Sequence, residues 1–248
     1  GVDSSESDDF SLRVFVGSRV ASVSASPGFD LTVLAERAVA MAKASPEDPF
    51  ACLADAADLS RDHADLGLFD PTEVSSAQLT DAALDMENAA LAVQGVSNSA
   101  GAGASASMGG LVLVTSHGFS GSYMATRFGR GISVIAGEGT GMERDHEGDS
   151  RLHFADLDAA SDIGRKAGER AVRRLNPRKA DTGNGVTVIY DPRVARGLVS
   201  HVASAINGAA IARKTSFLKD RMGQQILRRG LVISDNPQIY KGSSSRPF

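Results

Sequence analysis

The sequence predicts an α+β fold, in which helices pack on an antiparallel β-meander and the start of a second, mostly β domain follows. Segments with helical spacing of apolar residues occur before and after residues 95–154. Within 95–154 the pattern changes to short extended runs separated by glycine-rich turns. Consecutive strands joined by tight turns pair as an antiparallel meander, and we expect the helices to cover one face of it.

Length and composition are those of an ordinary globular protein. The 248 residues, 42% hydrophobic and 23% charged, suffice for one large domain or two modest ones. A net charge of -4 argues against nucleic acid as a partner. No apolar run approaches the ~20 residues that span a bilayer, so we expect no membrane segment. The single cysteine, Cys52, fits a cytoplasmic protein. The chain begins at Gly1 without an initiator methionine, and we expect a fragment of a longer protein.

The first elements are a hairpin and a helix. Apolar residues alternate with polar ones on both sides of Gly17-Ser18-Arg19, which predicts a hairpin within residues 12–24. Asp30 is a suitable N-cap for a helix that runs from about Leu31 to Lys43.

An irregular segment and a second helix follow. Prolines and aspartates between Ser45 and Asp70 predict a surface excursion with little regular structure. Asp70-Pro71-Thr72 is typical of a helix start, and the apolar spacing after it continues to about Val93. Within the meander, we expect Ala100–Gly110 to form a flexible hairpin tip and Arg144–Asp149 an exposed turn.

A third helix, capped by Ser161, ends near Leu175 and carries a basic stripe on its polar side. This stripe is a candidate surface for a partner or an anion, and consists of Arg165, Lys166, Arg170, Arg173 and Arg174. Residues 180–185 suggest a linker, so we divide the chain into domains 1–179 and 180–248. Strands over 186–190 and 231–234 and a helix over 194–206 are expected in the second domain.

The residues alone identify no catalytic or metal-binding site. The histidines are scattered, and none has the i, i+4 partner of a helical zinc pair. No GxSxG nucleophile motif is present.

Several stretches together nevertheless resemble the TldD/PmbA family, also called modulator of DNA gyrase proteins, and specifically its PmbA (TldE) branch. The resemblance covers nearly the whole chain, although family members are longer at both ends. The matching stretches are LRVFVGSRVASVS, VTSHGFSGSY, ISVIAGEG, MERD, HFADLD, GERAVRRLNPRK, AAIARKTSFLKDRMGQQI and KGSSSRPF.

The resemblance implies a metallopeptidase made of two kinds of subunit. A TldD subunit carries a zinc motif, HExxxH, and pairs with a TldE subunit to enclose a cavity in which unfolded peptides are cleaved. Alignment on Arg213-Lys214 places Ser200 and Ala205 at the two histidine positions and His201 at the glutamate position. The motif is therefore degenerate, and the resemblance implies no catalytic residue and no metal in this chain.

The expected function is that of the non-catalytic partner subunit. We expect a heterodimer with a TldD-like subunit that holds the zinc, or self-association, and unfolded peptide as substrate. Two alternatives stay open: a metallopeptidase active on its own through another site, and a regulatory module linked to DNA gyrase without direct DNA binding.

Overall fold

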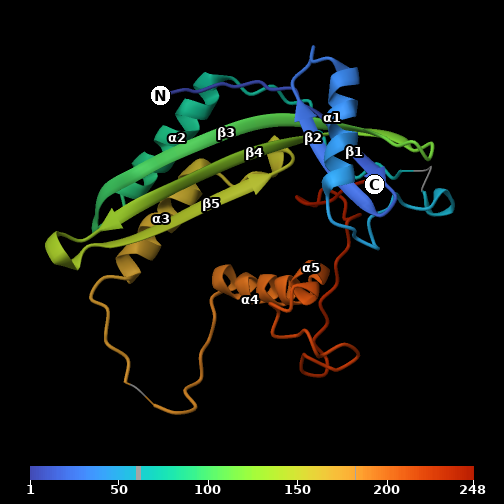
Figure 1. Ribbon diagram of the computed structural model, residues 1–248. Helices are drawn as coiled ribbons and strands as arrows, with labels where there is room; N and C mark the ends of the chain where they lie inside the picture. Colours follow the sequence, from blue (N-terminus) through green and yellow to red (C-terminus); the bar gives the residue numbers. More distant parts are fainter. Residues whose placement is uncertain (60–62, 182) are drawn as a thin grey trace. The chain divides into compact units, whose positions relative to one another are not determined.

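The computed structural model describes residues 1–59, 63–181 and 183–248, and the chain forms two compact units (Figure 1). The first unit consists of Gly1–Leu175 and Gln238–Phe248, and the second of Asn176–Pro237. The last residues of the chain thus belong to the first unit, and the domain division after residue 179 stays a prediction. The combination of helices and antiparallel sheets confirms the predicted α+β class.

The predicted hairpin and the helix after it form a small layer of their own. Strands β1 (Phe10–Val16) and β2 (Arg19–Ala25) pair antiparallel, and helix α1 (Leu31–Ala44) follows. The carboxylate of Asp30 caps α1, as expected, by accepting hydrogen bonds from the next backbone N–H groups. Leu34 and Ala38 of α1 are buried against Val23 of β2. Helix α1 thus packs on this hairpin, whereas the sequence analysis assigned it to the meander.

The segment before the second helix is mostly irregular, as predicted, with a short 3-10 helix at Ala56–Asp58; residues 60–62 of it lie outside the described chain. Helix α2 spans Ser76–Leu91. Its start at Asp70 was predicted wrongly, because Ser75 and Gln78 form a capping box that fixes the first turn six residues later.

The meander consists of three long strands in the order β3-β4-β5, all antiparallel. They are β3 (Val96–Val114), β4 (Ser120–Ala136) and β5 (Glu143–Arg151). The expected flexible tip at Ala100–Gly110 lies inside β3, and the expected turn at Arg144–Asp149 lies inside β5. Both predictions were wrong. The backbone N–H and C=O groups of these stretches pair with the neighbouring strand, and glycine or charged residues do not prevent this pairing.

Two helices cover one face of this sheet (Figure 1). Helix α3 (Ala160–Arg173) packs beside α2, and Met86, Val134 and Ile163 lie fully buried between helices and sheet. Gly164 allows the close approach of the two helices, because a Cβ atom there would overlap the carbonyl oxygen of Met86. The predicted cap Ser161 lies within α3, and Ala159 occupies the N-cap position instead.

The second unit contains helices α4 (Pro192–Ala205) and α5 (Gly208–Ala212). The strands predicted over 186–190 and 231–234 are irregular in the structure. Their apolar side chains fit strands, but the described residues of this unit contain no other strand with which they could pair. Residue 182 of the predicted linker lies outside the described chain. None of the described helices is long and apolar enough to cross a lipid bilayer.

Candidate functional site

Ser200, His201 and Ala205, which the family resemblance places at the zinc-motif positions, lie on α4. The Ser200 hydroxyl donates a hydrogen bond to the carbonyl oxygen of Arg196 at 3.3 Å, and the His201 side chain is exposed. Ala205 is buried and has no ligand atom in its side chain. A zinc site needs three or four nitrogen, sulfur or carboxylate ligands around one point. These residues do not fit such a site, and no cluster of three candidate ligands occurs in the described parts of the chain.

The basic stripe of α3 is engaged in ion pairs. Arg165 pairs with Asp162 at 2.9 Å and with Glu169 at 2.8 Å, and these hydrogen bonds raise the pKa of the guanidinium. Further pairs join Lys166 to Asp158, Arg170 to Glu147, and Arg174 to Glu143 and Asp145. Arg173 donates to the carbonyl oxygen of Glu169. Much of the positive charge is therefore balanced locally, and a role for the stripe in binding stays a prediction.

A buried carboxylate organises the segment that precedes α2. Asp70 accepts hydrogen bonds from the backbone N–H of Phe154 and from both the backbone N–H and the hydroxyl of Thr72. Its own N–H donates to the Thr126 hydroxyl on β4, and the N–H of Thr126 donates to Leu68. The Thr72 hydroxyl is the main cause of the lowered pKa of Asp70, which therefore stays ionised. This network holds residues 66–72 against β4.

The last residues of the chain, 238–248, dock on the same part of the first unit. The backbone N–H of Lys241 donates to Leu66 at 2.7 Å, and its ammonium pairs with Asp156 at 2.8 Å. The hydrogen bond between the Lys241 ammonium and the Asp156 carboxylate raises the pKa of Lys241 and lowers the pKa of Asp156. At the end of the chain, Phe248 lies edge-on to Phe119 and Tyr123, with ring centroids 5.1 and 5.5 Å apart. We refer to residues 238–248 as the C-terminal segment.

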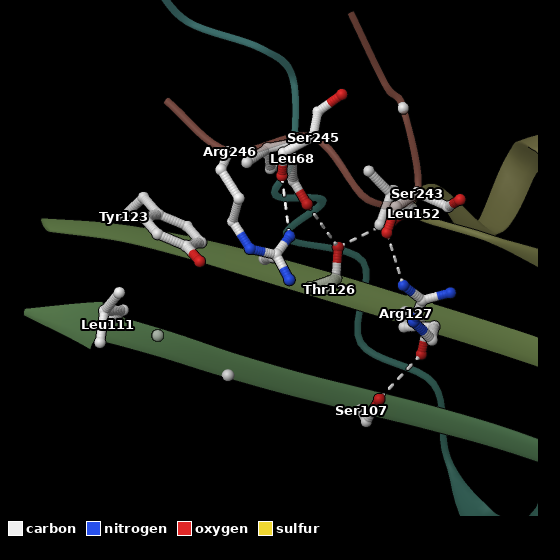
Figure 2. Close-up of a pocket in the computed structure, with 14 residues that line it drawn as sticks. Leu68, Ser107, Leu111, Tyr123, Thr126, Arg127, Leu152, Ser243, Ser245 and Arg246 are labelled. Carbon is white, nitrogen blue, oxygen red and sulfur yellow. Dashed lines mark hydrogen bonds between the residues drawn. The ribbon is translucent and has the colours of Figure 1, made fainter. Parts of the chain in front are cut away.

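A cavity of about 310 Å³ lies between this C-terminal segment and strands β3 and β4 (Figure 2). Leu68, Leu111 and Leu152 contribute apolar wall, and Gly109 and Gly110 leave room above β3. Two guanidinium groups line it, those of Arg127 on β4 and Arg246 in the C-terminal segment. The arrangement combines positive charge with an apolar wall, so it can bind an organic anion.

Sequence patterns predicted neither this cavity nor the two segments that build it. Asp70 was assigned to a helix start, and KGSSSRPF, which supplies Arg246 and Phe248, was used only as part of a resemblance. A signal was present in the two buried-type leucines, Leu66 and Leu68, within a segment expected to lie on the surface.

Comparisons with known proteins cover most of the chain. The profile of the PmbA/TldA metallopeptidase central domain matches residues 69–175, and that of the PmbA/TldA metallopeptidase C-terminal domain matches residues 182–248. The Metalloprotease PmbA homolog of Haemophilus influenzae is 34% identical over 96% of this chain and 53% of its own length. Metalloprotease PmbA of Escherichia coli O157:H7 is 36% identical over 86% of this chain and 47% of its own length. The chain thus spans about half the length of these relatives.

Solved structures show the same fold. A Bacteroides thetaiotaomicron protein described as a candidate modulator of DNA gyrase matches with a TM-score of 0.83 and 25% identity, over 95% of this chain and 55% of that one. TldE from Thermococcus kodakarensis matches with a TM-score of 0.63 and 18% identity, over 84% of this chain and 47% of that one. At 18% identity the second likeness concerns the fold alone.

Proposed function

Because the chain belongs to the PmbA/TldD family of metallopeptidases, we propose that it forms part of a non-catalytic subunit in a two-subunit enzyme that cleaves unfolded peptides. The proposal rests on Ser200, His201 and Ala205, which lie on α4 and which the family resemblance places at the zinc-motif positions. Ala205 has no ligand atom in its side chain, and the Ser200 hydroxyl donates to its own helix. His201 belongs to no cluster of three candidate metal ligands among the described residues.

In this proposal a TldD-like subunit supplies the zinc ligands and the glutamate that activates water. The present chain supplies a wall of the peptide-binding space. The outer edge of β3 supports this role, because β3 is an edge strand and Val96–Val114 contains neither proline nor a charged residue. Such an edge can accept an extended peptide as an additional strand. A cytoplasmic location stays a prediction.

The test is to assay cleavage of an unfolded peptide by this chain alone, by a TldD-like subunit alone, and by the two mixed. We expect zinc-dependent cleavage only with the TldD-like subunit present, and faster cleavage when both are present. His201→Ala should leave the rate of the mixture unchanged, because His201 is not a ligand in the proposal. As a matched control, a TldD-like subunit without its motif glutamate should abolish cleavage.

Three outcomes would contradict the proposal. Zinc-dependent cleavage by this chain alone, lost in His201→Ala, would favour an independently active metallopeptidase. Failure of the two subunits to associate or to affect each other's activity would remove the basis for a partner subunit. An effect on gyrase supercoiling without any effect on peptide cleavage would favour the regulatory alternative.

A further inference from the structure

We propose that the cavity between β3, β4 and the C-terminal segment is a subsite for a carboxylate of a bound peptide, with Arg127 and Arg246 as its positive groups (Figure 2). The inference rests on the proposed function in one respect, because it takes the ligand to be a peptide. It adds a chemical preference, for an acidic group, that the degenerate zinc motif does not imply.

The positive charge of the two cavity arginines is not compensated by a neighbouring carboxylate. None of the fourteen described residues that line the cavity is an aspartate or glutamate. Across the described chain, Arg127 and Arg246 form no ion pair, whereas Arg151 and Arg170, elsewhere in the first unit, are paired with Asp149 and Glu147. Two like charges at one cavity raise the local positive potential, which favours an anion. Since the whole chain has a net charge of -4, this positive charge is a local feature of the cavity.

Both guanidinium groups are held in place by neutral acceptors. Arg127 donates to the carbonyl oxygen of Ser243 at 2.8 Å and to the Ser150 hydroxyl at 3.3 Å. Arg246 donates to the carbonyl oxygen of Ser245 at 2.8 Å and lies over the ring of Tyr123. These contacts orient the groups without neutralising them. Each guanidinium has five N–H donors, so each retains donors for a ligand.

The apolar wall of the cavity indicates which kind of anion it binds. Leu68, Leu111 and Leu152 give the cavity an apolar wall beside the two arginines. An apolar wall beside planar, paired donors suits a carboxylate attached to a carbon skeleton, because the wall can bury the methylene groups while the fork-shaped donors bind both oxygens. Inorganic phosphate would use the arginines but leave the apolar wall in contact with water.

The test compares peptides that differ in the presence and the position of a carboxylate. Isothermal titration of the unmodified chain would use acetyl-Ala-Leu-Ala-Leu as the free acid, the same peptide as its carboxamide, and the carboxamide with glutamate at the third position. We expect the free acid or the glutamate peptide to bind about tenfold more tightly than the neutral carboxamide. Comparison of the two acidic peptides shows whether the carboxylate comes from the terminus or from a side chain. Because both arginines are exposed, the preference should weaken as salt rises.

Arg127→Gln and Arg246→Gln should each reduce the preference for the acidic peptide, and Arg37→Gln, on the exposed face of α1, should retain it as a control with the same change in charge. Equal binding of acidic and neutral peptides by the unmodified chain would overturn the proposal, as would a preference retained in both cavity variants. Binding of inorganic phosphate with no binding of any peptide would also overturn it. These titrations use the chain without a partner, so their failure leaves the cleavage test of the proposed function unaffected.

Discussion

Asp70 joins three parts of the first unit that are distant in sequence. Its carboxylate accepts from Thr72 beside it and from Phe154, and its N–H reaches Thr126 on β4. The Thr126 hydroxyl in turn donates to the carbonyl oxygen of Leu152 at 2.7 Å. A buried group with this many partners is costly to replace, because its donors lose their acceptor without regaining water. The floor of the cavity, which includes Leu68, Thr126 and Leu152, therefore depends on Asp70.

Asp70→Asn should lower the free energy of unfolding at neutral pH by about 1 to 3 kcal/mol, since hydrogen bonds to a buried charged group are weakened. The pKa of Asp70 is lowered in the folded protein, so its contribution is fully present above the unfolded pKa of about 3.9 and is lost as pH falls through the folded value. The difference between the protein and the variant should shrink below about pH 4. Denaturant unfolding of the protein and the variant, at neutral pH and below about pH 4, measures this difference in the free energy of unfolding.

Asp81→Asn is the matched control, because Asp81 is exposed on α2 and its substitution should change stability little at either pH. A stability loss in Asp70→Asn that is equally large in acid and at neutral pH would show that packing, and not the carboxylate charge, determines the effect.

Sequence patterns identified Asp30 correctly as a helix cap but assigned Asp70 wrongly to a helix start. The two cases differ in how far along the sequence the hydrogen-bond partners lie. The partners of Asp30 are the next residues of its own helix, which the local pattern predicts. The partner of the Asp70 N–H is 56 residues away, on a strand whose position depends on the whole sheet. In the same way, the residues at the zinc-motif positions followed from a family resemblance, whereas Arg127 and Arg246 meet only because the C-terminal segment returns to β4.

At the level of elements, the direction of the backbone groups along the outer edge of β3 follows from the strand register. Thr126 lies opposite Met108, but its N–H donates away from β3 to Leu68. The Met108–Thr126 pair is therefore not hydrogen-bonded, and in an antiparallel ladder every second pair along the strand has this property. Val112, opposite Ser122, belongs to the same set. Its N–H thus points outward, where an added strand would bind it.

Val112→Pro should therefore weaken peptide binding in the proposed two-subunit enzyme by about tenfold, because it removes one outward donor and leaves the bonds to β4 intact. Val112→Ala keeps the N–H group and is the control for the side chain, which is 73% exposed. The Michaelis constant of the mixture, measured for an unfolded peptide, reports the effect. If both variants behaved alike, strand addition at this part of β3 would be excluded.

Strand β3 also shows why its glycine-rich part was predicted wrongly as a hairpin tip. Glycine is typical of turns, yet Gly103 and Gly131 face each other in the β3–β4 ladder. Alternation of glycine with alanine and serine leaves the pairing intact, because each backbone group finds its partner on the neighbouring strand. Glycine spacing alone does not distinguish a flexible hairpin tip from a strand of residues with small side chains. The helices were predicted more accurately because their caps and apolar spacing are local.

At the level of the whole molecule, the two units differ in how much core they contain. In the first unit, α2 and α3 bury a cluster that includes Met86, Val134 and Ile163. Between residues 176 and 237, the described residues that are buried are Ala205 and Ser216. Sequence patterning predicted the helix at 194–206 correctly, because amphipathic spacing shows that a face is apolar. It does not show what covers that face, and Val194, Leu198 and Val199 are exposed in this chain.

Hydrogen exchange tests this difference, because α3 and α4 each contain 14 residues and can be compared directly. Exchange from a helix without a buried face requires only local opening, whereas exchange from α3 requires disruption of the core between helices and sheet. We expect amides in the middle of α3 to exchange at least about 100-fold more slowly than those of α4 in the isolated chain. If a TldD-like subunit binds the second unit, its addition should slow exchange in α4 and leave α3 unchanged. Equal protection of both helices in the isolated chain would show that the second unit has a stable core of its own.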